Sequence, residues 1–276
     1  MGVKLLTQKT TAHQGQWALV LGASSGFGAA TAIELAKCGM NVFGVHLDTR
    51  NTLPNAQKIV SDIRALGRDA VFFNTNAADS AKRAEVLDKV QAQIDSGNGK
   101  GKVAVLLHSL AFGTLKPFIA DTPTDAITQK QLDMTLDVMA NSLVYWTQDL
   151  AGRNLLGNGS KIFAMTSAGS TRVWNSYGAV SAAKAALEAH VRQLAFELAA
   201  KGIAVNAIRA GVTDTPALRK IPGNDKLLKD ASTRNPGGRL TTPQDVARAV
   251  AALCTDPSAW ITGNVIGVDG GEDIVA

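Results

Sequence analysis

The chain has 276 residues, of which 46% are hydrophobic, and it carries a formal net charge of +5. This length and hydrophobic content suit a folded α/β domain with a sizeable core, and they argue against wholesale disorder. The charge is modest and no Lys/Arg run contains interleaved aromatic residues, so we do not expect a nucleic-acid partner.

Short apolar runs alternate with segments of helical spacing along most of the chain. Strands are predicted at 17–23, 41–47, 70–76, 102–109, 160–166, 203–209 and 264–268, and helices at 28–39, 55–67, about 80–95, about 129–152 and about 176–201. Such alternation is typical of an α/β fold with a doubly wound, Rossmann-like parallel sheet. We expect a single domain over residues 16–276, preceded by a polar, loose arm over residues 1–15.

The alternation is interrupted at residues 212–238, a segment rich in charge, glycine and proline. A segment of this length inside a compact domain is usually functional. We interpret it as a mobile, helical lid over a substrate cleft, and the alternative is an ordinary surface excursion.

A glycine-rich turn, LGASSGFGAA, links the first predicted strand to the first predicted helix. Gly22, Gly26 and Gly28 let the backbone turn tightly and approach a phosphate closely. The helix N-terminus behind them offers free N–H groups to a pyrophosphate, and Ser24 and Ser25 add hydroxyl donors. At the first strand–helix junction of an alternating chain, this pattern indicates a dinucleotide site.

The end of the second predicted strand contains both signals that distinguish the two nicotinamide cofactors. An acidic residue there binds the adenosine ribose of NAD, whereas a basic residue accepts the 2′-phosphate of NADP. The sequence HLDTR offers Asp48 and Arg50 after His46, which lies where the strand meets the ribose. With Arg50 as the phosphate ligand we favour NADPH. The alternative, that Asp48 caps the next turn and Arg50 is merely solvated, stays open, and so does NADH.

Several motifs together resemble the short-chain dehydrogenases/reductases over about residues 15–272. They are GASSGFG, Asn76, LLHSLAF, Ser167, Tyr177, Lys184 and AGVTDTPAL, in that order. Within that superfamily the chain looks most like the enoyl-acyl-carrier-protein reductases, especially type III. The Tyr-x6-Lys spacing, the HSLAF run and the segment DTPALRKIPGNDKLLKDA carry this narrower resemblance.

The resemblance implies catalytic roles for Tyr177 and Lys184. Ser167 takes the place where other enoyl reductases have a second tyrosine, so its role is left open. The cofactor residues implied are Gly22, Ser24, Ser25, Gly26, Phe27, Gly28, His46, Arg50, Asn76, Ala77, Ser109, Leu110, Lys184, Val212, Thr213 and Thr215, and the substrate residues are Phe112, Trp174, Tyr177 and Leu218.

Two departures from the common superfamily pattern bear on the reaction. Val180 occupies the usual tyrosine position, and Met139 occupies the position of a catalytic asparagine. A tyrosine moved three residues along a helix is displaced by ~4.5 Å. In an enoyl thioester the charge collects on the thioester oxygen, away from the carbon that accepts the hydride, so the displaced Tyr177 suits an oxyanion-binding role.

We therefore predict NAD(P)H-dependent reduction of the α,β double bond of acyl-carrier-protein or CoA thioesters in fatty-acid synthesis. One alternative is a reductase of β-ketoacyl, steroid or other carbonyl substrates. A further alternative is a catalytically silent regulator that binds NAD(P)H.

The remaining expectations concern the setting of the protein. The two cysteines form no framework or CxxC site, and the four histidines have no ligand spacing, so no metal is expected. No apolar run approaches the ~18 residues of a membrane span, and we expect a cytoplasmic protein. The family resemblance implies a homotetramer formed through the helices at about 129–152 and 176–201.

Overall fold

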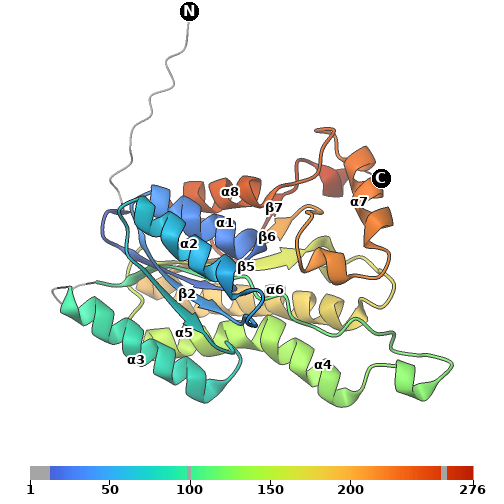
Figure 1. Cartoon of the computed structure of the whole chain (residues 1–276), viewed down its shortest axis with the longest axis horizontal. Helices are drawn as coiled ribbons and strands as arrows, with labels where there is room; N and C mark the ends of the chain where they lie inside the picture. The colour runs from blue at the N-terminus through green and yellow to red at the C-terminus, as the bar shows by residue number, and fades with distance from the viewer. Residues whose placement is uncertain (1–12, 98–100, 256–259, 276) are drawn as a thin grey trace, which may run out of the picture.

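The computed structural model describes residues 13–97, 101–255 and 260–275, and these form a seven-stranded parallel sheet between two layers of helices (Figure 1). The strand order is β3-β2-β1-β4-β5-β6-β7, so the chain reverses its direction of winding between β1 and β4. The strands are β1 (Trp17–Leu21), β2 (Asn41–His46), β3 (Ala70–Asn74), β4 (Val103–His108), β5 (Lys161–Ser167), β6 (Ala204–Ala210) and β7 (Val265–Val268).

The helices cover both faces of this sheet. They are α1 (Gly26–Lys37), α2 (Leu53–Ala65), α3 (Ser80–Ser96), α4 (Gln129–Leu136), α5 (Ser142–Gly152), α6 (Gly178–Leu198), α7 (Asn224–Arg234) and α8 (Pro243–Thr255). Figure 1 shows α1, α2 and α8 on one face of the sheet and α3, α5 and α6 on the other. The predicted doubly wound, Rossmann-like fold is confirmed.

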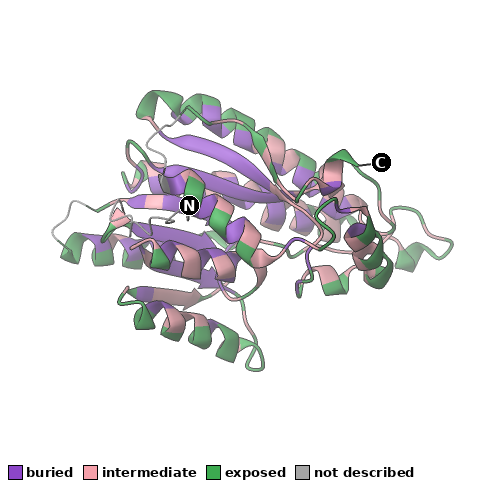
Figure 2. Ribbon diagram, turned by 90° about the horizontal axis from the view of Figure 1, so that it is seen from above, coloured by how far each residue is buried: buried purple, intermediate pink, exposed green. Residues whose placement is uncertain are grey.

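Burial explains why the strands read as apolar runs. Figure 2 shows the strands buried in the middle of the molecule while the helices expose their outer faces. Every residue of β1 is buried, because helices cover both of its faces. Parallel strands in this position are continuous apolar runs rather than alternating ones.

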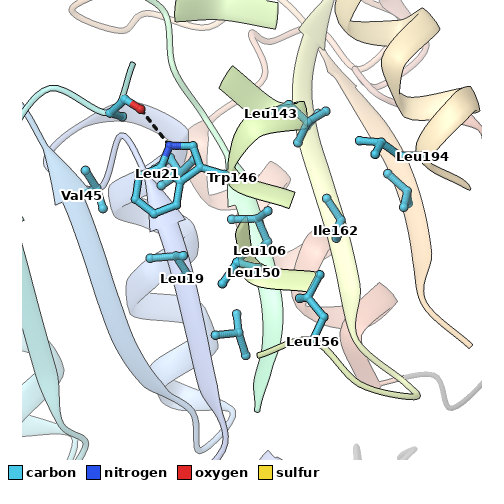
Figure 3. Packing of buried hydrophobic residues seen from close by; sticks show 14 of the residues in the cluster. Leu19, Leu21, Val45, Leu106, Leu143, Trp146, Leu150, Leu156, Ile162 and Leu194 are labelled. Atoms are coloured by element: carbon cyan, nitrogen blue, oxygen red, sulfur yellow. Dashed lines mark hydrogen bonds between the residues drawn. The ribbon is translucent and has the colours of Figure 1, made fainter. Parts of the chain in front are cut away.

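The core beneath α5 is organised around Trp146, whose side chain is fully buried (Figure 3). It packs among aliphatic side chains of the strands and of α5, including Leu19, Leu106 and Leu150. Its indole Nε1 donates a hydrogen bond to the backbone oxygen of Ala77 at 2.8 Å, which satisfies the one polar atom that this large side chain would otherwise bury alone.

Two features differ from the sequence-based prediction. The single helix expected at 129–152 is divided by a π-helical turn over Asp137–Asn141. Helix α8 was not predicted, although Pro243 at its first position is a typical helix start. The segment 212–238 contains helix α7, in agreement with the helical lid that was predicted there. The predicted arm, residues 1–15, lies almost wholly outside the described residues.

Candidate functional site

The glycine-rich turn after β1 has the backbone that only glycine adopts easily. Gly22 has φ +89° and Gly26 has φ +53°, both in the left-handed region. A Cβ on Gly22 would collide with the backbone oxygen of Ser109, which follows β4. The turn can therefore lie against the end of the neighbouring strand only because this position has no side chain.

The first turn of α1 is equally crowded. A Cβ on Gly28 would collide with the backbone oxygen of Gly22. Ser25 is the N-cap residue, and no side chain caps the free N–H groups of this helix. A Cβ on Gly26 would lie 3.6 Å from Thr215 Cγ2, so the start of the 212–238 segment faces the turn. This cradle fits the pyrophosphate of a dinucleotide.

An acidic side chain lies at the carboxyl end of β2. Asp48 Oδ2 is 2.7 Å from Nδ1 of His46, which is buried. Burial tends to raise the pKa of Asp48, but Thr52, Ser24 and His46 together hold it below its usual range. Because Ser24 belongs to the glycine turn, the carboxylate lies beside the cradle rather than pointing away from it. Arg50, two residues further on, is exposed.

Two more of the expected cofactor residues follow β3. Asn76 Oδ1 accepts a hydrogen bond from the backbone N–H of Ala78 at 3.0 Å, which shapes the turn that leads into α3. Ala77 is buried, and its carbonyl is held by Trp146. The core of the protein therefore fixes this turn directly.

A cavity of about 490 Å³ opens above the carboxyl ends of β4, β5 and β6. Twelve of the residues expected at the site line it: Phe27, Ser109, Leu110, Phe112, Ser167, Trp174, Tyr177, Lys184, Val212, Thr213, Thr215 and Leu218. The other expected cofactor residues lie outside the cavity lining, on the turns after β1, β2 and β3. The predicted site therefore consists of a nucleotide cradle on the strand-end turns and an adjoining chamber whose lining contains both expected cofactor residues and expected substrate residues.

Tyr177 is the N-cap residue of α6, and its backbone is already helical. The residue before it, Ser176, has φ +58°, an uncommon value for a residue other than glycine. Gly169 leaves room for the tyrosine ring, since a Cβ there would lie 2.5 Å from Tyr177 Cε1 and 3.2 Å from Ser167 Oγ. Tyr177 and Ser167 therefore flank the same small space.

The phenol of Tyr177 keeps its proton at neutral pH. Burial raises its pKa above the usual value, and the neighbouring Ser167 opposes this only partly. Ser167 Oγ is buried and has no hydrogen-bond partner of normal geometry among the described residues. The two hydroxyls are therefore neighbours rather than a bonded pair, and both are available to a substrate oxygen.

Lys184 follows Tyr177 by two turns of α6 and is buried. Its Nζ donates a hydrogen bond to the backbone oxygen of Met165 at 2.6 Å. Burial lowers the pKa of this amine to about 8, against the opposing charge of Glu188. The ammonium has two further donors, which are free to bind ribose hydroxyls.

His108 ends β4 and is a structural residue in this arrangement. It is fully buried, and its Nε2 lies 2.8 Å from Ser142 Oγ. Burial, and then the nearby charge of Lys184, lower its pKa to about 3, so the ring is neutral.

Val180 and Met139 are the two departures from the common pattern, and both are apolar walls of the cavity. Both are buried, and Met139 lies in the π-helical turn. A Cβ on Gly113 would lie 2.9 Å from Met139 Sδ and 3.1 Å from Val180 Cγ2, so the two side chains approach the same point. No polar group stands where a usual tyrosine and asparagine would act.

Charged side chains at the far end of the cavity were missed by the sequence analysis. They are Arg172, Arg209, Arg234, Asp269, Glu272 and Asp273, and all line the cavity. They come from four separate places in the chain and have no common spacing. The run DGGED shows that acidic residues are concentrated near the C-terminus, but not what they contact.

No group of three or more metal-ligating side chains occurs within residues 13–97, 101–255 and 260–275. In the same part of the chain, no helix is long and apolar enough to cross a membrane.

Comparison with protein families decides the classification. The model of the family described as "Enoyl-(Acyl carrier protein) reductase" matches residues 22–272. The chain belongs to this short-chain dehydrogenase/reductase family. The predicted resemblance is thereby confirmed, and a nicotinamide cofactor agrees with the cradle described above.

Relatives of this short-chain dehydrogenase/reductase have several substrates. 1-Cyclohexenylcarbonyl-CoA reductase of Streptomyces collinus is 29% identical over 98% of this chain and 91% of its own length. The 3-oxoacyl-[acyl-carrier-protein] reductase FabG of Pseudomonas aeruginosa is 30% identical over 94% of this chain and 97% of its own length. The crystal structure of the Enoyl-[acyl-carrier-protein] reductase (NADH) from Aquifex aeolicus VF5 has a TM-score of 0.79 at 25% identity, covering 96% of this chain and 98% of the other.

Proposed function

We propose that this short-chain dehydrogenase/reductase reduces the α,β double bond of enoyl thioesters carried by CoA or acyl-carrier protein. One observation carries the proposal. The hydroxyl donor, Tyr177, stands at the start of α6, seven residues before Lys184, while apolar Val180 occupies the intermediate position in the cavity wall. The donor is therefore displaced along the helix from the place that suits an oxygen on the hydride-accepting carbon.

The reduced nicotinamide supplies a hydride when bound. The protein's own contribution is position and charge. Addition of hydride to the β-carbon would leave negative charge on the thioester oxygen, and the Tyr177 hydroxyl would donate a hydrogen bond to that oxygen. A proton from water at the α-carbon then completes the saturated product. Ser167 Oγ, which faces the same space, is a second donor for the thioester oxygen. Lys184 would hold the ribose hydroxyls, and its positive charge favours the developing oxyanion.

The apolar lining of the chamber agrees with an acyl substrate. Phe112, Trp174 and Leu218 line its outer part, and Val180 and Met139 its inner part. The Streptomyces collinus relative, named for an enoyl-CoA substrate, supports this chemistry. The Pseudomonas aeruginosa relative, named for 3-oxoacyl reduction, is the reason to test the carbonyl alternative beside it.

The deciding experiment follows cofactor oxidation with crotonyl-CoA and acetoacetyl-CoA in parallel. We expect turnover of the enoyl compound and little of the keto compound. Reduction of acetoacetyl-CoA alone would replace the proposal with carbonyl reduction. Tight cofactor binding without turnover of either compound would indicate a silent NAD(P)H-binding protein.

Tyr177→Phe tests the oxyanion role. Loss of one oxyanion donor lowers kcat by about 10²–10³-fold, and we expect such a loss with crotonyl-CoA while the Kd of the cofactor is unchanged. Tyr145→Phe is a matched control, because Tyr145 is the only other tyrosine and lies away from the cavity, beside Arg83. A decrease in kcat of less than about threefold in Tyr177→Phe would be far smaller than the loss expected for such a donor. That result contradicts the assignment.

For the cofactor we propose a preference for NADH, with the Asp48 carboxylate facing the ribose. The sequence alone favoured NADPH through Arg50, and that preference stays a prediction. The support for NADH is the position of Asp48 beside Ser24 and its lowered pKa, which keep a negative charge where a 2′-phosphate would lie.

Asp48→Asn is the corresponding variant. Removing the charge should raise kcat/KM with NADPH by at least about tenfold. The repulsion between two like charges a few ångströms apart is larger than the free energy that a roughly tenfold change in kcat/KM requires. Asp62→Asn is the control, because Asp62 pairs with Lys58 on the surface of α2. A wild-type enzyme that prefers NADPH contradicts the proposal.

A further inference from the structure

Six of the charged residues that line the cavity form two sets of ion pairs, one around Asp273 and one between Arg234 and Glu272. Arg172 comes from the loop before Tyr177, Arg209 from β6 and Arg234 from the end of α7. Their partners are Asp269, Glu272 and Asp273, all within a few residues of the carboxyl end of the described chain, which lies beside α7 in Figure 1. Three positive and three negative side chains therefore balance within the same wall.

Asp273 ties the loop before Tyr177 to the sheet. Its carboxylate lies 2.9 Å from Arg172 Nη2 through Oδ1 and 2.9 Å from Arg209 Nη1 through Oδ2. Arg172 also donates a hydrogen bond to the backbone oxygen of Asp273 at 3.0 Å. Arg172 is five residues before Tyr177 and two before Trp174, so this double contact acts on the segment that carries both.

Glu272 ties together the two ends of the lid segment. Its Oε2 accepts a hydrogen bond from the backbone N–H of Val212 at 2.9 Å, where the lid begins. Its Oε1 lies 3.2 Å from Arg234 Nη2, where α7 ends. The side chain is buried, so replacing its carboxylate would leave Arg234 without its partner in a site shielded from solvent, which is costly.

The two walls also meet directly. Trp174 Nε1 donates a hydrogen bond to the backbone oxygen of Pro222, which precedes α7, at 3.0 Å. The loop and the lid are therefore joined over the cavity by Trp174 and behind it by residues 269–273. A Cβ on Gly211 would lie 3.0 Å from Asp269 Cα and 3.0 Å from Glu272 Oε2, so this C-terminal turn is packed tightly against the end of β6.

We infer that Glu272 and Asp273 are positioning residues, which hold the lid and the Tyr177 loop at the separation that the substrate requires. Both line the cavity, and the contacts described above are made to other protein groups. Each acts through another residue: Glu272 through Val212 and Arg234, and Asp273 through Arg172. The inference rests on the proposed function only for the choice of assay substrate.

The kinetic experiment compares Glu272→Gln and Asp273→Asn with wild type, using crotonyl-CoA. Glu272→Gln loosens only the lid, so KM should rise about tenfold while kcat stays within about twofold. This pattern is expected when an interaction that binds substrate and transition state equally is lost. Asp273→Asn instead weakens the hold on the loop that ends at Tyr177, so kcat should fall about tenfold. Asp225→Asn is the control, an exposed acidic residue of α7 outside the cavity, and should match wild type.

Amide hydrogen exchange supplies a readout that does not depend on turnover. Glu272→Gln should increase exchange within 212–234 and Asp273→Asn within 168–177, with the strands β1 to β5 as protected as in wild type. Unchanged KM and kcat in both variants overturn the inference. Increased exchange spread evenly over the sheet also overturns it, since that shows a general loss of stability. A wild-type enzyme inactive on crotonyl-CoA rejects the proposed function, and the exchange experiment still decides the inference.

Discussion

Lys184 shows how burial adjusts a single side chain for use at neutral pH. Burial lowers the pKa of this amine from 10.5 to about 8, yet the Met165 carbonyl and the charge of Glu188 favour its charged form. The buried ammonium is unfavourable for folding at neutral pH. Because the unfolded chain holds this proton more tightly, the cost decreases as pH rises from about 8 towards 10.5.

The activity should have the opposite pH dependence, because the oxyanion needs the charged amine. We expect kcat/KM to fall as pH rises through about 8, since this parameter reports the groups of the free enzyme. Tyr177 stays protonated in that range, because its pKa is raised above 10.0. Lys184→Met should leave a small residual rate without this dependence. A wild-type profile that is flat well beyond pH 8 contradicts the role of Lys184.

At the scale of elements, the active loop between β5 and α6 is placed by residues that have little or no side chain. Gly169 leaves the space that the Tyr177 ring occupies, and Gly178 leaves a similar space for the ring of Phe118. Ser176 turns the chain through the left-handed region immediately before the tyrosine. The direction of Tyr177 therefore depends on the backbone around it as well as on α6.

Gly169→Ala tests this placement. The new methyl group would lie 2.5 Å from Tyr177 Cε1, so the ring must move away from the substrate oxygen. We expect kcat to fall by at least about tenfold, as for a misplaced catalytic group. Gly152→Ala at the end of α5, where a Cβ meets nothing within 4 Å, is the matched control and should behave as wild type. Equal activity of the two variants would show that the ring tolerates the change.

At the scale of the whole molecule, the core and the nucleotide end of the site share side chains. Trp146 packs against the strands from α5 and also holds the carbonyl of Ala77, in the turn after β3 (Figure 3). The strand order reverses between β1 and β4, and the glycine turn after β1 lies there against the end of β4, beside the cavity. Ligands of open parallel sheets bind at such a point.

Trp146→Phe measures this contribution to stability. The variant loses buried volume and leaves the Ala77 oxygen without its donor, so the free energy of unfolding should fall by about 2–4 kcal/mol. Urea denaturation should show a lower midpoint with an unchanged m-value. Trp260→Phe, at a residue that is 93% exposed, should change the stability by less than about 0.5 kcal/mol. Similar losses in both variants would contradict the importance of this contact.

Local patterns were sufficient to predict most elements, but not all. The strands were found because each contains a short run of apolar residues, which in the central strands both helix layers cover. The π-helical turn at Asp137–Asn141 was not found, because it changes hydrogen bonding within a helix without changing its apolar spacing. The displacement of Tyr177 from Val180 was visible in the sequence, because both lie on one helix and their separation follows from residue number.

The sequence by itself determined the parallel α/β fold, the glycine turn and the Tyr177–Lys184 pair, because each depends on residues that are near one another in the chain. Only the tertiary structure decided which way Asp48 faces and what residues 269–273 hold. The role of Asp48 depends on its interaction with Ser24, which lies on another strand–helix turn. The role of Glu272 depends on its contacts with Val212 and Arg234. No regular pattern in the sequence marks contacts between distant segments, because these contacts form only when the sheet brings the ends of its strands together.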